Sequence, residues 1–198
     1  MEDDPYREIR YSGSDLPPIK AFDKMGHTIA NSFSKIFSPG CRLGYILAND
    51  EVVEKLLDIK TAVNTHTSML LQIICAEFFR LGYYSQHHKM ICDLYRERRD
   101  TMIECIDKFF PIGTKRTFPE GGLFTWAELP GGINTTALLA EATTNPDVKV
   151  AYVAGEGFFC EGGGKGNNYM RISFSGVTPA KIRIGAERLG KLICSKLK

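Results

Sequence analysis

The fold of this chain is indicated by one segment, Ser32-Phe33-Ser34-Lys35-Ile36-Phe37-Ser38-Pro39-Gly40-Cys41-Arg42-Leu43-Gly44-Tyr45. It places serine hydroxyls, the amine of Lys35, a Pro-Gly turn and the guanidinium of Arg42 between two apolar segments. A lysine ε-amine can form a Schiff base with an aldehyde. Serine hydroxyls and arginine bind phosphate through directed hydrogen bonds. The segment therefore predicts a site for a ligand that carries both an aldehyde and a phosphate.

Pyridoxal 5′-phosphate (PLP) is the cofactor that combines these two groups. The plain alternative is a strand, a turn and a strand with solvated cations, since the chain has 25 Lys and Arg residues. Lys35, however, follows a predicted buried strand over 27–33, and a second apolar strand over 43–48 is of the kind found inside parallel sheets. We therefore predict that Lys35 is the Schiff-base lysine.

Three residues outside this segment could complete such a site. A buried carboxylate at Asp3 would keep a pyridine nitrogen protonated, although an acidic, solvated segment is the alternative. Tyr6 could donate its hydroxyl to the phenolic oxygen of the cofactor, or it could be an ordinary sheet tyrosine. Arg171 lies in a predicted strand whose neighbours look partly buried, so its guanidinium needs an anion. A substrate carboxylate and an internal salt bridge suit it equally well.

Composition excludes several other classes. The 25 basic and 23 acidic residues give no polyanion-binding signature, so no nucleic-acid partner is expected. The six cysteines are scattered without a C-x-x-C pair, which argues against a zinc ribbon and fits reduced thiols in a cytoplasm. No apolar run is long enough to span a bilayer, and the acidic start is not a signal peptide. We expect a cytoplasmic protein without a membrane partner.

Two further motifs are interpreted as structural. The glycine-rich stretch 161–166 lacks the first glycine and the Ser/Thr of a phosphate loop, so we interpret it as a flexible connection. His87 and His88 are adjacent and point to different helix faces, so they cannot share a metal and look like surface residues. No metal site is predicted.

The pattern along the chain predicts an α/β part followed by an α+β part. Strands are expected over 6–11, 27–33 and 43–48, and helices from Asn49, over 68–81 and over 85–110. Strands over 121–129, 148–153 and 169–175 follow, with helices over 135–143 and from Thr178, where Pro179 takes the first position.

Several segments resemble motifs of class I/II aminotransferases, which are PLP enzymes of fold type I, in the family's order over essentially the whole chain. These segments are 2–6, 32–45, 121–126, 155–159 and 167–175. The most similar branch is that of the 2-aminoadipate, kynurenine and aromatic aminotransferases. Asn31 replaces a common glycine, and Ala154 replaces the usual proline.

The resemblance implies a role for each candidate residue and an exchange of amino groups between an amino acid and a 2-oxo acid. Lys35 would be catalytic, Asp3 would pair with the pyridine nitrogen, and Tyr6 would pair with the phenolic oxygen. The phosphate would be held by Ser32, Ser34 and Arg42, and the substrate carboxylate would be bound by Arg171. A homodimer is also implied. The alternatives are a PLP lyase of the same fold, the effector domain of a transcription regulator, and a non-catalytic aminotransferase-like interaction domain.

The resemblance also implies a partial fold, since a family subunit is about twice as long. Residues 1–83 would be the C-terminal part of the large PLP-binding domain, a remnant of its sheet. Residues 84–198 would form the small domain together with the long interdomain helix. A sheet remnant exposes edges and faces that its fold normally covers. We therefore expect the part up to about Gly82 to be weakly supported, PLP to bind weakly, and little activity without complementation.

Overall fold

The computed structural model describes residues 1–23, 26–160 and 164–197. These residues form two compact units, Met1–Asp93 and Leu94–Lys198, and helix α3 (Tyr83–Phe109) contributes residues to both. The glycine-rich stretch at 161–166 lies partly outside the described residues. The α/β fold class, with a long helix leading into an α+β unit, is confirmed.

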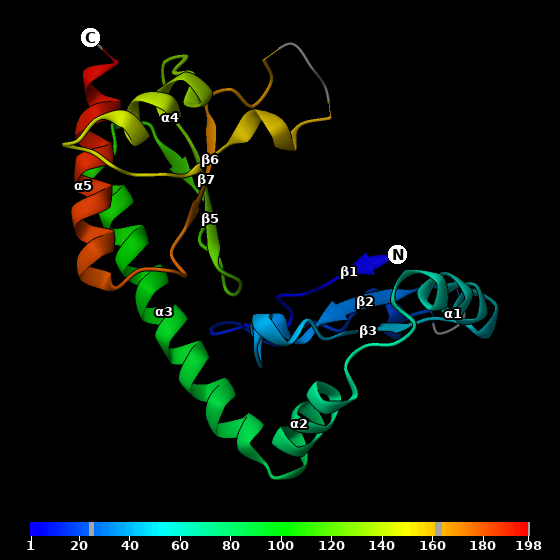
Figure 1. Ribbon diagram of the computed structural model, residues 1–198. Helices are drawn as coiled ribbons and strands as arrows, with labels where there is room; N and C mark the ends of the chain where they lie inside the picture. The colour runs from blue at the N-terminus through cyan, green and yellow to red at the C-terminus, as the bar shows by residue number, and fades with distance from the viewer. Residues whose placement is uncertain (24–25, 161–163, 198) are drawn as a thin grey trace. The chain divides into compact units, whose positions relative to one another are not determined.

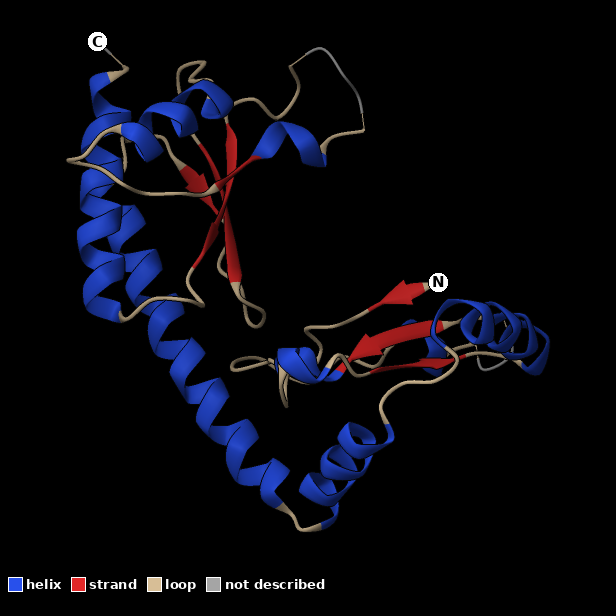
Figure 2. Cartoon of the chain, viewed as in Figure 1, coloured by secondary structure: helices blue, strands red, loops and turns tan. Residues whose placement is uncertain are grey.

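The first unit contains a three-stranded sheet in the order β1-β2-β3 (Figure 2). Strand β1 (Glu2–Asp3) pairs in parallel with β2 (Ile29–Ser32), and β2 pairs antiparallel with β3 (Gly44–Leu47). The remaining elements of this unit are the 3-10 turns η1 (Ile19–Ala21), η2 (Phe33–Lys35) and η3 (Pro39–Cys41) and the helices α1 (Asp50–Asn64) and α2 (Met69–Arg80).

Two predictions for this unit are wrong. The strand expected over 6–11 does not form: residues 5–8 are turns, in which the amides of Arg7 and Ile9 donate to the carbonyls of Asp4 and Tyr6, and Arg10 makes only an isolated bridge. The strand β3 is not inside a parallel sheet; it pairs antiparallel with β2, and all four of its residues are exposed.

The two helices of the first unit expose their apolar faces. In α1, Asn49 caps the first turn by accepting a hydrogen bond from the amide of Val52 at 3.0 Å, as its sequence predicts. No residue of α1 is buried, and α2 buries only Cys75. The apolar residues that these helices expose most include Leu57, Ile59, Val63, Met69, Leu70 and Ile73. The predicted apolar faces are therefore present, but the described residues do not cover them.

The second unit contains a four-stranded antiparallel sheet in the order β4-β5-β7-β6. Its strands are β4 (Lys115–Arg116), β5 (Phe124–Glu128), β6 (Val153–Ala154) and β7 (Tyr169–Ser173), and its other elements are η4 (Gly155–Phe158) and the helices α4 (Thr135–Thr144) and α5 (Pro179–Ser195). Helix α5 runs beside α3 (Figure 1). The predicted strand over 148–153 is reduced to its last residue and Ala154.

This second unit has a continuous core. Residues of β5 and β7 alternate between half-buried and buried, as a sheet with one covered face requires. Helix α5 begins at the predicted Thr178 cap and buries Ile182, Ala186, Leu189 and Ile193. Among the described residues, 21 buried apolar side chains lie in this unit and eight lie in the first.

The six cysteines are free thiols. Cys75, Cys92 and Cys105 are buried, whereas Cys160 and Cys194 are exposed. Burial raises the pKa of the Cys75 and Cys105 thiols, so both stay protonated and unreactive near neutral pH. Among the residues that the structure describes, no group of His, Cys, Asp and Glu could hold a metal, and no helix is long and apolar enough to cross a membrane.

Candidate active site

The position of Lys35 is set by the way β2 ends. Ser32, the last residue of the strand, is extended and caps the single 3-10 turn that follows, because its Oγ accepts a hydrogen bond from the amide of Ser34 at 3.1 Å. The same hydroxyl donates to Ser34 Oγ at 2.8 Å. Lys35 closes this turn, and the buried side chain of Ile36 anchors the chain after it. Two hydroxyls and an amine are thus held within four consecutive residues.

Tyr6 lies against Lys35. The ammonium of Lys35 is 5.3 Å from the centroid of the Tyr6 ring, within the range of a cation–π contact. Tyr6 is in the turn that follows β1, and its ring is half-buried. Residues that lie 29 positions apart in the sequence therefore share one site.

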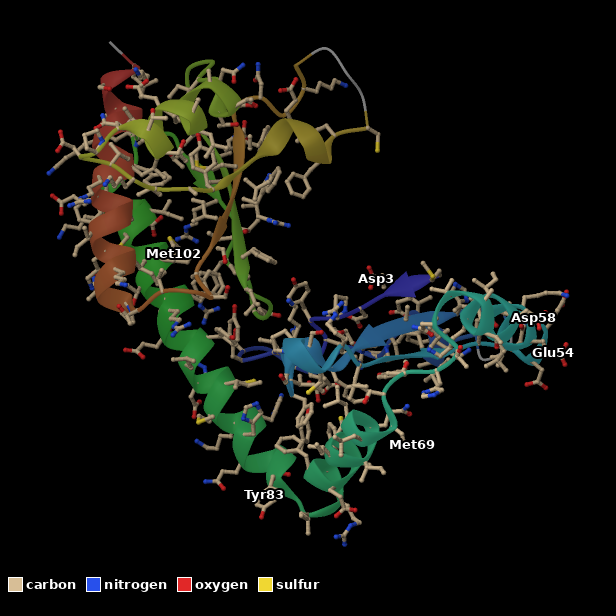
Figure 3. All side chains as sticks on the ribbon, viewed as in Figure 1. Asp3, Glu54, Asp58, Met69, Tyr83 and Met102 are labelled. Carbon is tan, nitrogen blue, oxygen red and sulfur yellow. The ribbon has the colours of Figure 1, made fainter. Side chains whose placement is uncertain are left out.

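Asp3 lies on the sheet face that also carries Ser32. Asp3 pairs with Ala30 in the parallel register, and alternate residues of β2 face the same side, so Asp3, Ala30 and Ser32 share one face. Gly44 is the partner of Ser32 and adds no side chain to this face. Asp3 is exposed in this unit (Figure 3), where the sequence suggested a buried carboxylate. The carboxylate shares a sheet face with Ser32, but the described residues do not bury it.

Arg42 sits at the end of the loop that returns to the sheet. Its backbone is in the left-handed region, with φ of 52°, and its Nη1 donates to the carbonyl of Pro39 at 3.2 Å. The next carbonyl, of Leu43, accepts from the amide of Phe33 at 3.1 Å and from Ser32 Oγ at 3.4 Å. The loop therefore closes onto Ser32, one residue from the exposed guanidinium.

Residues that sequence reasoning missed fix the segment after Asp3. The hydroxyl of Tyr84 donates to Glu8 at 3.2 Å, and His88 Nε2 lies 2.5 Å from the carbonyl of Glu8. Burial raises the pKa of Tyr84, and the charge of Glu8 adds to that shift. His88 is therefore not the simple surface residue that we expected. No local pattern reveals these contacts, because they join positions about 80 residues apart.

Arg171 lies in the second unit, on β7 between Trp126 of β5 and Val153 of β6. Its guanidinium carbon is 4.3 Å from the ring centroid of Phe124 and 5.1 Å from that of Phe158. Within the described ranges its buried Nε has no hydrogen-bond partner, and no carboxylate forms a salt bridge with it. The described residues therefore do not supply the internal salt bridge considered above. An aromatic bracket with an unsatisfied donor suits an incoming carboxylate.

The donor set fits PLP. Lys35 offers an amine for an aldehyde, and the paired hydroxyls of Ser32 and Ser34 offer donors to a phosphate. Asp3 offers a carboxylate on the same sheet face as Ser32. Six of the seven predicted residues belong to the first unit, and Arg171 belongs to the second.

Comparison with known proteins places the chain in a family. The model of aminotransferase class I and II matches residues 1–189. The chain belongs to this aminotransferase family. It is 42% identical, over all of its length, to aromatic-amino-acid aminotransferase 1 of Thermococcus litoralis, of which it covers 46%.

Two solved aminotransferase structures are similar to the chain. The kynurenine aminotransferase of Pyrococcus horikoshii, in complex with PMP, kynurenine and its product, has a TM-score of 0.91 and 37% identity. All of this chain and 48% of that one are covered. The α-aminoadipate aminotransferase LysN of Thermus thermophilus, complexed with N-(5′-phosphopyridoxyl)-L-leucine, has a TM-score of 0.89 and 33% identity, with coverage of 99% and 50%. The chain thus spans about half the length of the aminotransferases it matches.

Proposed function

We propose that this chain supplies the lysine-bearing part of a PLP-dependent aminotransferase, which exchanges an amino group between an amino acid and a 2-oxo acid. The observation that carries the proposal is the arrangement of Lys35: a turn capped by Ser32 carries it, its amine lies 5.3 Å from the centre of the Tyr6 ring, and the residues just before it, Ser32 and Ser34, have paired hydroxyls. Family membership and the PLP-derived ligand in the LysN structure support it.

In this proposal each residue acts through a named atom. When bound, PLP supplies an electron sink that stabilises negative charge at the substrate Cα. Lys35 Nζ would hold the cofactor by condensing with its aldehyde, with loss of water, and as a free amine would move a proton to and from the substrate Cα. The Asp3 carboxylate keeps the pyridine nitrogen protonated, and the Tyr6 hydroxyl donates to the phenolic oxygen.

The remaining three residues bind anionic groups. The hydroxyls of Ser32 and Ser34 and the guanidinium of Arg42 hold the phosphate, and Arg171 holds the substrate carboxylate in its bidentate fork. The bracket of Phe124 and Phe158 fixes the plane of the Arg171 guanidinium before substrate arrives, so less conformational entropy is lost on binding.

We further propose the finer assignments that the sequence suggested. Residues 1–83 belong to the large PLP-binding domain and 84–198 to the small domain, and the assembled enzyme is a cytoplasmic homodimer. The chain by itself is expected to bind PLP weakly and to turn over slowly. Its match to about half of each relative and the uncovered faces of α1 and α2 support that expectation.

The decisive test is to trap the lysine adduct. The chain is incubated with PLP, reduced with borohydride, digested and mapped by mass spectrometry. A pyridoxyl group on Lys35 is expected, and it should be lost in Lys35→Ala but retained in Lys55→Ala, which removes an exposed lysine of α1. The assignment would be overturned if the unaltered chain carried no adduct on Lys35 and the Lys35→Ala variant still carried adducts on other lysines. Rapid transamination by this chain alone would contradict only its expected weakness.

A further inference from the structure

The second unit holds a cavity that plays no part in the proposed transamination. It lies between α3, β7, α5 and the segment 148–151, and its volume is about 410 Å³, within the range of small-molecule sites. Met102 of α3, labelled in Figure 3, contributes to it. Its floor consists of buried apolar side chains, namely Met102, Phe110, Val148, Ile172, Ile182 and Leu189.

Ile172, which lines the cavity, and Arg171 lie on opposite faces of β7, and Ser173 at the end of the strand also lines the cavity. Arg171 and Ile172 are consecutive in the strand, and consecutive side chains point to opposite sides of a sheet. Arg171 stacks on Phe124 and Phe158, whereas Ile172 is buried in the cavity floor. A ligand in this cavity would therefore not occupy the position proposed for the substrate carboxylate.

Helix α5 lines the cavity with a glycine, Gly185. A Cβ at this position would contact Val150 at 3.6 Å, an ordinary van der Waals distance, so the helix leaves room here that no side chain fills. The exposed apolar side chains of Val177 and Ile184 extend the wall outward. An apolar group can thus enter from solvent and cover them.

The rim of the cavity is positively charged. Lys149, Lys181 and Arg188 line it, and the lining includes no acidic residue. In the described part of the chain none of these three forms a salt bridge, whereas their neighbours Arg183 and Lys191 on α5 pair with Glu104 at 3.0 Å and Glu187 at 2.7 Å. Among the described residues, Lys149 and Lys181 thus face the cavity without a carboxylate partner, whereas the charge of Arg188 also acts on Glu187.

The backbone at Lys149 adds to this arrangement. Its φ of 48° lies in the left-handed region, which costs a lysine about 1 kcal/mol. The amide of Lys149 donates to Asn145 and that of Val150 to Ala142, both at 3.1 Å, and these bonds hold the bend. The chain therefore keeps a lysine at the cavity edge in a conformation that glycine would adopt more easily.

We propose that this cavity binds an amphipathic monoanion, a carboxylate with an unbranched or aromatic apolar body of medium length. The carboxylate is held by Lys181 and Arg188 at the rim, with Lys149 nearby, and the apolar body covers the floor beside Gly185. This site goes beyond the proposed transaminase function and does not depend on PLP.

The test is calorimetric titration of the 198-residue chain with octanoate, below the concentration at which octanoate forms micelles. Saturable binding with one site per chain is expected. Octanol, which lacks the charge, and acetate, which lacks the body, should each bind at least about tenfold more weakly, since a charge-assisted hydrogen bond and buried methylenes are each worth that much.

Variants assign the binding to the cavity. Gly185→Leu should abolish it by filling the floor, and Lys181→Gln combined with Arg188→Gln should weaken octanoate roughly tenfold while leaving octanol unchanged. Lys191→Gln, which removes the cation paired with Glu187, should change nothing. Lys35→Ala should also leave octanoate binding intact, so a failed transaminase proposal would not affect this result.

Three outcomes would overturn the proposal. They are octanoate binding that survives Gly185→Leu, octanoate that binds no more tightly than octanol, and no saturable binding in a folded protein. The circular dichroism spectrum of each variant is compared with that of the parent chain, and the combined Lys181→Gln and Arg188→Gln variant, whose residues are exposed, decides the test if the leucine variant does not fold.

Discussion

The hydroxyl of Ser32 has two tasks that are usually separate. It caps the turn that positions Lys35 by accepting from the amide of Ser34, and it is one of the two hydroxyls proposed to hold phosphate. Ser34 has only the second task, because the capping hydrogen bond uses the backbone amide of Ser34 and not its side chain. The two serines therefore differ in what their removal should cost.

We expect Ser32→Ala to lower the free energy of unfolding by about 1 kcal/mol, the usual loss for a serine cap, and Ser34→Ala to change it by less than about 0.5 kcal/mol. Both should weaken PLP binding. Urea unfolding without PLP measures the effect on stability alone, and titration with PLP, followed by absorbance, measures the effect on PLP affinity. Equal stability losses in the two variants would show that the capping bond does not position the turn.

Sequence reasoning reached most of the candidate site because its residues are close in the sequence. Lys35, Ser32, Ser34 and Arg42 fall within one loop, and local chemistry is enough to relate them. The exposure of Asp3 could not be predicted in this way, because burial depends on which segments cover a strand. The aromatic bracket of Arg171 was missed for the same reason, since Phe124 is on the neighbouring strand and Phe158 is on η4.

Among the elements, α5 contains two glycines with opposite surroundings. Gly190 packs against the backbone of α3, where an added Cβ would lie 2.8 Å from the carbonyl carbon of Phe109. Gly185 faces the cavity, where an added Cβ meets only Val150 at 3.6 Å. The same residue type thus permits close helix packing at one position and leaves open space at the other.

Gly190→Ala should destabilise the second unit by roughly 1–3 kcal/mol, because the clash with α3 outweighs the better helix propensity of alanine. Gly185→Ala should stabilise it by up to about 1 kcal/mol, since only the propensity changes. Thermal unfolding of the two variants measures the contrast. If Gly190→Ala raised the melting temperature, α3 and α5 would be shown to move apart without any loss of stability in the second unit.

The elements themselves were predictable wherever local signals set them. Asn49, Thr178 and Pro179 mark helix starts, and the structure begins α1 and α5 next to them. The short strand β4 and the antiparallel pairing of β3 were missed, because strand pairing depends on partners distant in sequence. The apolar faces of α1 and α2 were recognised, although the periodicity of a helix does not say whether another segment covers that face.

At the scale of the whole molecule, the two units differ in how many apolar residues they bury. The second unit packs a sheet against α4, α5 and its part of α3, whereas most apolar residues of α1, α2 and β3 in the first unit remain in solvent. Buried apolar area is the main favourable term in folding. Stability should therefore be distributed unevenly along the chain.

Residues 94–198 expressed alone are expected to unfold cooperatively, with dispersed amide resonances, whereas residues 1–93 alone should give broad resonances and no cooperative transition. Heteronuclear correlation spectra and thermal scans of the two fragments make the comparison. Cooperative unfolding of 1–93 would mean that its exposed apolar faces do not limit its stability.

Because both units contain buried cysteines, the difference in their stability can be measured by thiol alkylation. Cys75 and Cys92 are buried in the first unit and Cys105 in the second, while Cys160 and Cys194 are already accessible. Alkylation of a buried thiol needs a local opening, so its rate measures the free energy of that opening. Mass spectrometry of a timed alkylation thus measures the free energy of local opening in both units, in one sample and at the native cysteines.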